Sequence, residues 1–254
     1  MKMDIQNDIE RALGKLGPQK MSDLAQEIGV EPSALNGPVE AMVREGLLFK
    51  TKKDRYALPE ALGLMRGRLQ GNARGFGFFI PADGQPDVFL PAGAMNGALH
   101  GDTIFVRITN REKREGEVVR VIAHANDVIV GTFEMDGTAS YVVPDEQRIF
   151  VDVYVPKEER GGAKDNDKVV VRVTQWGKNS RNPRGHVVEV LGNKDDIGTD
   201  IKSLIRLHKL DEEFPQSVLA AAAQLPDRVL PKDLAGREDL RKLNAFTIDG
   251  ATAK

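Results

Sequence analysis

A cluster of phenylalanine side chains is the part of this sequence best suited to contact a ligand. The stretch ARGFGFFIP, residues 73–81, holds three of the ten phenylalanines of the chain, with Arg74 just before them. Residues two apart on a β-strand point to the same face, so the rings of Phe76 and Phe78 should share one face while Phe79 points to the other. Flat rings next to a cation can stack on the bases of a single-stranded nucleic acid, whatever the base.

A third ring can join this face from the next strand. Phe89 lies in the run DVFLP, and an antiparallel neighbour would place it beside Phe78. Each stacked base contributes roughly 1–3 kcal/mol, and Arg68 and Arg74 are candidates for contacts to the backbone phosphates. The competing interpretation is that the rings form a hydrophobic core, where Phe79 is expected in either case.

The strands that would carry these rings occur twice. Residues 66–192 consist of short runs of valine and aromatic residues separated by Gly, Asp and Pro, which is typical of β-barrels. The interval from Pro91 to Asp102 is repeated from Pro156 to Asp167, with eleven residues in both cases. We therefore predict two tandem five-stranded barrels of the OB type, a fold that binds oligonucleotides on its second and third strands.

The second copy keeps only part of the aromatic cluster. It has Ala139, Tyr141 and Tyr154 at the positions of the three phenylalanines. A tyrosine ring still stacks on a base, so the second barrel is expected to bind RNA more weakly than the first. The alternative is that this barrel is a structural spacer.

The segments on either side of the repeat differ from it. Residues 5–16 place apolar side chains at helical spacing, and further helical patterns precede a hairpin whose tip is KTKKDR. Three short helices and a hairpin predict a winged helix, with Pro38 at the first position of the third helix. Residues 193–254 mix helical runs with three prolines and end on an apolar stretch, which predicts an irregular α/β segment.

Composition limits the classes of function. The net charge is −2, and residues 66–126 alone have more basic than acidic side chains, with eight Lys or Arg against six Asp or Glu. A chain without cysteine has neither disulfides nor thiolate zinc sites. The beginning of the chain lacks the apolar core of a signal peptide, and no run of about 18 apolar residues is present. We therefore expect a cytoplasmic protein that does not contact membranes.

The motifs and their order resemble a known family. The pair RGFGFFIP and DVFLP is similar to the nucleic-acid motifs of cold-shock domains, and the order of segments, ending in REDLRKLNAFTIDG, resembles the N-terminal half of exoribonucleases of the ribonuclease II family. The resemblance implies processive 3′→5′ hydrolysis of RNA to mononucleotides by the whole enzyme. It also implies single-stranded RNA as the partner, and contacts with the ribosome or the RNA-decay machinery.

The same resemblance implies where the metal-binding aspartates of the family would lie. In that family the catalytic domain opens with TID-G-x-x-A-x-D-x-D-D, whose four aspartates hold two Mg²⁺ ions. Asp249 in TIDGATAK matches the first aspartate, and the other three would fall after Lys254. The resemblance therefore implies a chain truncated at the start of the catalytic domain. Such a chain binds RNA without cutting it and binds no Mg²⁺ itself.

These features give a mixed α and β, multidomain organisation. The expected domains are a winged helix, two cold-shock-like OB barrels, and a linker with the start of a catalytic domain, at residues 1–62, 66–126, 127–192 and 193–254. Two other functions stay open: a free-standing RNA-binding or RNA-chaperone protein of cold-shock type, and a DNA-binding regulator that acts through the winged helix.

Overall fold

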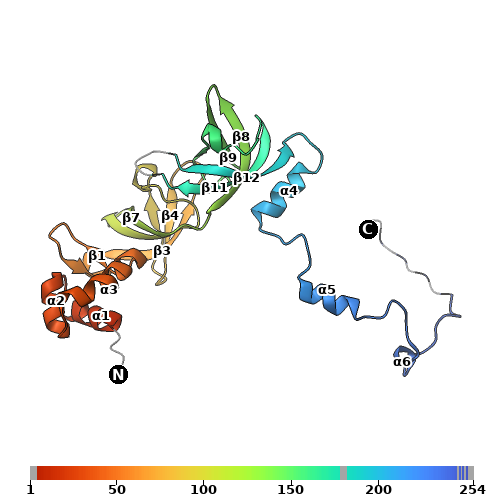
Figure 1. The fold of residues 1–254 in the computed structure, drawn as a ribbon, viewed down its shortest axis with the longest axis horizontal. Coiled ribbons are helices and arrows are strands. Elements are labelled where there is room, and N and C mark those ends of the chain that lie inside the picture. Colours follow the sequence, from red (N-terminus) through yellow and green to blue (C-terminus); the bar gives the residue numbers. More distant parts are fainter. Residues whose placement is uncertain (1–4, 178–181, 245, 247, 249, 251–254) are drawn as a thin grey trace. The chain divides into compact units, whose positions relative to one another are not determined.

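The computed structural model describes residues 5–177, 182–244, 246, 248 and 250. The chain divides into two compact units, Met1–Leu210 and Asp211–Lys254. The first unit contains a helical region, two closed barrels and one further helix, and the second contains two short helices (Figure 1).

The N-terminal region consists of three helices and a two-stranded antiparallel sheet. Its elements are α1 (Ile5–Leu16), α2 (Met21–Ile28), α3 (Pro32–Glu45), β1 (Phe49–Lys50) and β2 (Tyr56–Ala57). The side chains that the helical spacing places inward form the core, among them Ile9, Leu24 and Met42, which have no exposed surface. The predicted helices and hairpin are therefore present.

The prediction that the third helix begins at Pro38 is wrong. Pro32 occupies the first turn of α3, and Pro38 lies inside the 14-residue helix. The first turn tolerates proline because its N–H groups lack helical partners, whereas an internal proline removes one backbone hydrogen bond. Burial of Leu35 and Val39 on either side of Pro38 stabilises the continuous helix.

The first barrel has the strand order β3-β4-β5-β7-β6, with β5 and β7 parallel and the other pairs antiparallel. The strands are β3 (Leu64–Gly71), β4 (Gly77–Pro81), β5 (Val88–Leu90), β6 (Thr103–Asn110) and β7 (Glu115–Ala123). Inward and outward residues alternate along them, and Leu69, Phe79 and Val106 belong to the core. The expected position of Phe79 in the core is confirmed.

The second barrel repeats the topology of the first. Its strands are β8 (Val128–Asp136), β9 (Ala139–Pro144), β10 (Val153–Tyr154), β11 (Asp167–Gln175) and β12 (Arg184–Asn193), in the closed order β10-β12-β11-β8-β9. In both barrels a proline, Pro91 or Pro156, comes directly before a 3₁₀ helix between the third and fourth strands. The predicted tandem repeat of five-stranded barrels is confirmed.

Each barrel contributes one apolar side chain to the packing of the other barrel's core. Leu99 follows β5 in the first barrel but is buried in the core of the second, with 2% of its surface exposed. Phe150, from the second barrel, packs against the core of the first. Each core therefore packs against one residue of the other barrel, so this contact stabilises both barrels.

The remaining elements are helical. Helix α4 (Thr199–Leu207) packs on the second barrel, where Arg206 forms two hydrogen bonds with Glu189, of 2.8 and 3.0 Å. In the second unit, α5 (Gln216–Ala223) and α6 (Pro231–Leu234) bury none of their side chains. None of the helices among the described residues combines the length and hydropathy that spanning a bilayer requires.

Candidate nucleic-acid interface

The three phenylalanines predicted to form a stacking surface lie together on the outside of the first barrel. The ring centroids of Phe76 and Phe78 are 5.9 Å apart, those of Phe76 and Phe89 are 5.6 Å apart, and those of Phe78 and Phe89 are 5.7 Å apart. The rings are tilted or perpendicular to one another, as aromatic pairs prefer. We call these three side chains the phenylalanine platform.

Two different local structures assemble the platform. Phe78 on β4 lies directly opposite Phe89 on β5, so these rings are cross-strand neighbours. Phe76 is not on the strand as predicted but in the turn before it, where its carbonyl accepts a hydrogen bond from the amide of Asn72. Gly75 allows this turn because its φ of +85° lies in the left-handed region.

The platform is not part of the hydrophobic core. Phe78 has 40% of its surface exposed, and Phe76 and Phe89 are partly exposed. Phe79, between these positions, is fully buried. The alternative in which the three rings form the barrel core is therefore wrong, because the alternation along β4 turns Phe78 outward and Phe79 inward.

The two predicted arginines lie at different places around the platform. Arg74 is an exposed residue of the turn that carries Phe76. Arg68 is on β3, two residues from Gln70, which lies opposite Phe78; both side chains therefore face outward. The guanidinium of Arg68 donates a 3.5 Å hydrogen bond to the carbonyl of Gly101. Both cations thus border the face that the rings occupy.

The second barrel has the corresponding tyrosines at the corresponding positions. Tyr141 on β9 lies opposite Tyr154 on β10, with ring centroids 5.6 Å apart and a tilt of 56°. Phe78 and Phe89 show nearly the same geometry, with a tilt of 58°. Ala139 replaces the third ring, so the second barrel has a pair where the first has a cluster.

Carboxylates border the tyrosine pair. Glu134 on β8 lies opposite Tyr141. Burial raises the pKa of Asp152 above its usual range, and the charge of Glu134 raises it further. Acidic side chains at this place oppose the approach of phosphates.

We expect Asp152→Asn to stabilise the fold slightly at neutral pH. A carboxyl whose pKa is raised by folding favours the native state while it is protonated, and this contribution is lost as the pH rises through the pKa of the folded state. The side-chain amide of asparagine does not ionise, so the variant does not lose this stability as the pH rises. Melting temperatures of both proteins should therefore coincide below about pH 3.8, the unperturbed pKa, and separate toward pH 7. A variant that is less stable than the parent at pH 7 would contradict this.

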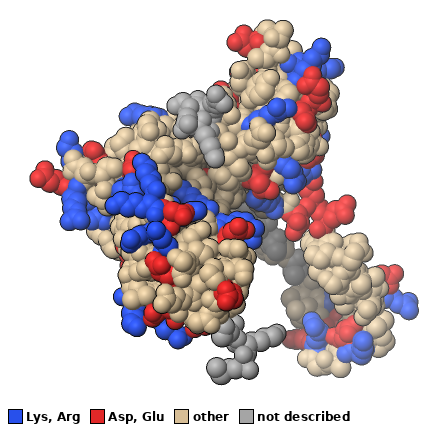
Figure 2. Space-filling view, turned by 60° about the vertical axis from the view of Figure 1, so that its left-hand side comes forward, with Lys and Arg blue, Asp and Glu red and all other residues tan. Residues whose placement is uncertain are grey.

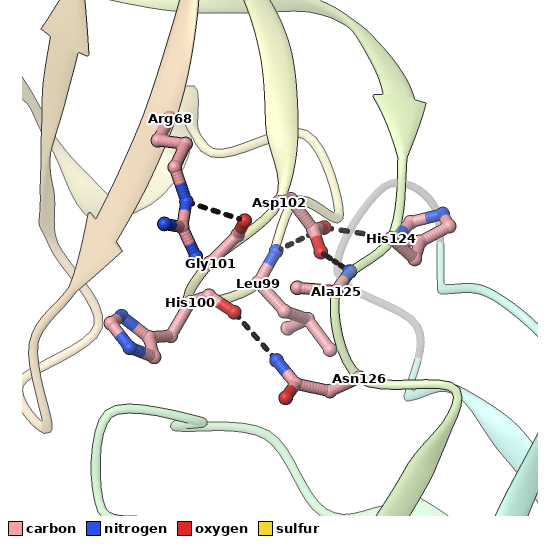
Figure 3. Close-up of polar contacts among 8 residues, drawn as sticks. All are labelled: Arg68, Leu99, His100, Gly101, Asp102, His124, Ala125 and Asn126. Atoms are coloured by element: carbon pink, nitrogen blue, oxygen red, sulfur yellow. Dashed lines mark hydrogen bonds and ion pairs between the residues drawn. The ribbon is translucent and has the colours of Figure 1, made fainter.

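A buried carboxylate holds a histidine at the junction between the barrels. Asp102 has no exposed surface, and its oxygens accept hydrogen bonds of 2.9 Å each from the amides of Leu99 and Ala125 and contact Nδ1 of His124 at 2.9 Å (Figure 3). The ring of His124 stacks on Trp176 of the second barrel, with centroids 3.5 Å apart. In the sequence, Asp102 stands out only as a position of the repeat, and its role as a buried acceptor has no local signal.

The histidines at this junction do not form a catalytic pair. The rings of His100 and His124 point away from each other (Figure 3). Burial and then the charge of Arg148 lower the pKa of His100, whose Nδ1 accepts a hydrogen bond from the amide of Gly71. Both histidine side chains therefore have structural hydrogen-bond partners.

The metal prediction rests on a residue that lies outside the described part of the chain, Asp249. Within the described residues, no group of three or more His, Asp or Glu side chains could hold a metal ion. These residues therefore do not fit a magnesium centre.

The surface charge is mixed. In Figure 2, Lys and Arg side chains gather in patches with Asp and Glu interspersed, and large areas carry neither. This distribution agrees with the net charge of −2. A ligand with phosphates would meet local cations, not a broad positive field.

Comparison with known proteins identifies related sequences. The Ribonuclease B OB domain family matches residues 67–121, and the Cold shock domain family matches residues 141–215. Ribonuclease R of Vibrio parahaemolyticus is 35% identical over 98% of this chain, and ribonuclease R of Acidithiobacillus ferrooxidans is 36% identical over 93%. The chain resembles the N-terminal portion of ribonuclease R.

The similarity to ribonuclease R covers only part of those proteins. The chain spans 29% of the length of the Vibrio enzyme and 56% of the length of the Acidithiobacillus one. Among solved structures, Mycoplasma genitalium RNase R in complex with ribose methylated single-stranded RNA superimposes with a TM-score of 0.56 and 20% identity. That match covers 64% of this chain and 27% of the ribonuclease R chain. It establishes similarity of fold.

Proposed function

We propose that this chain is the RNA-binding region of a ribonuclease R-like 3′→5′ exoribonuclease, with the phenylalanine platform as its main contact to single-stranded RNA. The observation that carries the proposal is the exposure of three clustered rings on β4, β5 and the preceding turn. The similarity to ribonuclease R supports it, and the Mycoplasma relative was solved with a single-stranded RNA.

Stacking explains why single strands are the ligand. Only an unpaired strand can present base faces to Phe76, Phe78 and Phe89, because the bases of a duplex already stack on one another. The rings accept any base, which suits an enzyme that must pass over all sequences. Arg68 and Arg74 would hold the phosphates on either side of the stacked bases.

The organisation of the whole protein is part of the proposal. We assign residues 1–62 to a winged helix, 66–126 and 127–192 to the two OB barrels, and 193–254 to the link with a catalytic domain. In the family resemblance, Asp249 would be the first of four aspartates that hold two Mg²⁺ ions. RNA hydrolysis and contacts with ribosomes or RNA-decay proteins would then belong to the longer enzyme.

The winged helix is proposed to engage RNA or a protein instead of reading duplex DNA. Residues 1–65 carry nine Lys or Arg against ten Asp or Glu, whereas phosphate contacts dominate DNA affinity. Pro38 also lies inside α3, the helix that would enter a DNA groove. The DNA-binding regulator is therefore the weaker candidate, and a free-standing RNA chaperone is the main alternative.

The purified chain should bind a labelled single-stranded RNA and leave its length unchanged in the presence of Mg²⁺. Two-metal hydrolysis needs several converging carboxylates, which the described residues do not provide. With two arginines on phosphates, the slope of log K against log salt should be about −1.4, since each neutralised phosphate of a single strand contributes about −0.7. Fluorescence anisotropy at several salt concentrations and a denaturing gel measure both quantities.

Three outcomes would count against the proposal. Mg²⁺-dependent release of mononucleotides, abolished by Asp249→Asn, would show that the chain is itself a nuclease. Nanomolar, sequence-dependent binding of a duplex DNA competitor would favour the DNA-binding regulator. Absence of RNA binding by the folded chain would remove the assigned role of the platform.

A further inference from the structure

A row of outward-facing side chains crosses the second barrel and carries opposite charges at its ends. Glu134 on β8 pairs with Tyr141 on β9, Tyr141 pairs with Tyr154 on β10, and Tyr154 pairs with Arg184 at the start of β12. Successive residues of a strand point to opposite faces, so a row whose chain neighbours are buried faces outward. The buried neighbours of Glu134, Tyr141 and Tyr154 are Phe133, Ser140, Val142, Val153 and Val155. We call these four residues the tyrosine row.

The first barrel has a row in the same register with different chemistry. Gln70 pairs with Phe78, Phe78 pairs with Phe89, and Phe89 pairs with Glu115, so this row has a carboxylate where the tyrosine row has the cation of Arg184. Gln70 therefore corresponds to Glu134. An amide both donates and accepts hydrogen bonds, whereas an ionised carboxylate only accepts. The two barrels thus offer similar stacking rings but different hydrogen-bonding groups beside them.

The polarity of the tyrosine row fixes the orientation of a bound nucleotide. Directly opposed cross-strand residues are about 5 Å apart at Cβ, so a base stacked on Tyr141 has one edge within reach of Glu134. The cation of Arg184, at the other end, attracts the phosphate, while Glu134 repels it. The edge of a base bound here would therefore face the carboxylate, and its phosphate would face the guanidinium.

A carboxylate distinguishes the bases by their donors. The Watson–Crick edge of guanine presents N1–H and the N2 amino group side by side, and these match the two oxygens of Glu134. Adenine and cytosine present one amino group next to an acceptor nitrogen, which the carboxylate repels. Uracil presents one N–H between two carbonyl oxygens. Only guanine can satisfy both oxygens at once.

We propose that the tyrosine row is a guanine-selective site and that Glu134 is the residue that determines its specificity. The first barrel, with Gln70 at the equivalent position, accepts any base. This proposal rests on the proposed RNA-binding function and adds base selectivity to it. It also gives the acidic surroundings of Tyr141 a role in recognition, because the carboxylate that disfavours phosphate is the group that reads the base.

The test compares two RNA dodecamers, one of uridine only and one with two adjacent guanines at its centre. Fluorescence anisotropy should show that the parent chain binds the guanine-containing RNA about five-fold or more tightly, the discrimination expected of a bidentate contact. Glu134→Gln should bring the ratio of the two affinities close to one. Gln70→Glu, in the equivalent position of the first barrel, should increase the ratio.

Asp152→Asn is the matched control. It removes a neighbouring negative charge but leaves the carboxylate of Glu134 in place, so both affinities should rise together and their ratio should stay the same. The replaced side chains lie outside the cores, and far-ultraviolet circular dichroism spectra equal to that of the parent chain would confirm intact folds. A ratio near one for the parent chain, or a ratio that Glu134→Gln leaves unchanged, would overturn the proposal.

Failure of this proposal differs from failure of the RNA-binding function. If the chain binds both RNAs equally and the binding depends on the phenylalanine platform, only the guanine selectivity is wrong. If the folded chain binds neither RNA, the proposed RNA-binding function itself is wrong.

Discussion

Replacement of Phe76, Phe78 and Phe89 by alanine is expected to weaken the binding of single-stranded RNA by at least ten-fold. Each base stacked on an aromatic side chain contributes roughly 1–3 kcal/mol, so the loss of even one full stack approaches that factor. The affinity of the triple variant for a uridine oligomer, measured by fluorescence anisotropy, tests this directly. The salt dependence should change little, because the arginines that contact phosphates remain.

A matched control is available on the same strand. Ile80 is 41% exposed and lies on the same face of β4 as Phe78, but its aliphatic side chain has no flat ring on which a base could stack. Ile80→Ala removes one exposed apolar side chain from the same face and should leave the affinity within about two-fold of the parent. If the triple variant is folded and its affinity is unchanged, the platform is not the RNA-binding surface.

Asp102→Ala is expected to lower the free energy of unfolding by roughly 3–5 kcal/mol, the typical result of removing one partner from a buried charged network. The change leaves the amides of Leu99 and Ala125 without their acceptor. The buried amide of Leu99 then costs about 1–3 kcal/mol, whereas Ala125 is exposed and its amide can bind water instead. It also removes the partner of His124, whose ring stacks on Trp176. The junction between the barrels should loosen.

Urea denaturation followed by tryptophan fluorescence measures this effect. Trp176 is the only tryptophan of the chain and lies at the junction, so its emission reports on the contact between the barrels. Asp167 is the equivalent residue of the second barrel and accepts the amide of Lys164, but it does not link two barrels. Asp167→Ala should therefore cost less. A larger loss from Asp167→Ala than from Asp102→Ala would contradict the assigned role of Asp102.

The local pattern of residue types is enough to predict the elements and their repetition. Helix α1 spans the residues that its apolar spacing predicted, and the two barrels share the strand order implied by the equal intervals from Pro91 to Asp102 and from Pro156 to Asp167. Such patterns are local, because a helix repeats every 3.6 residues and a strand every two. The same alternation placed Phe78 and Phe79 on opposite faces of one strand.

Which of those faces is outside, and what lies next to it, depends on packing between strands and between barrels. Closure of the barrel buries Phe79 and exposes Phe78, and a turn, not the strand, adds Phe76 to the cluster. The register that places Glu134 beside Tyr141 depends on hydrogen bonds between separate strands. The stack of His124 on Trp176 joins residues far apart in the chain. These contacts leave no periodic signal in the sequence, because barrel closure and packing between the barrels bring them together.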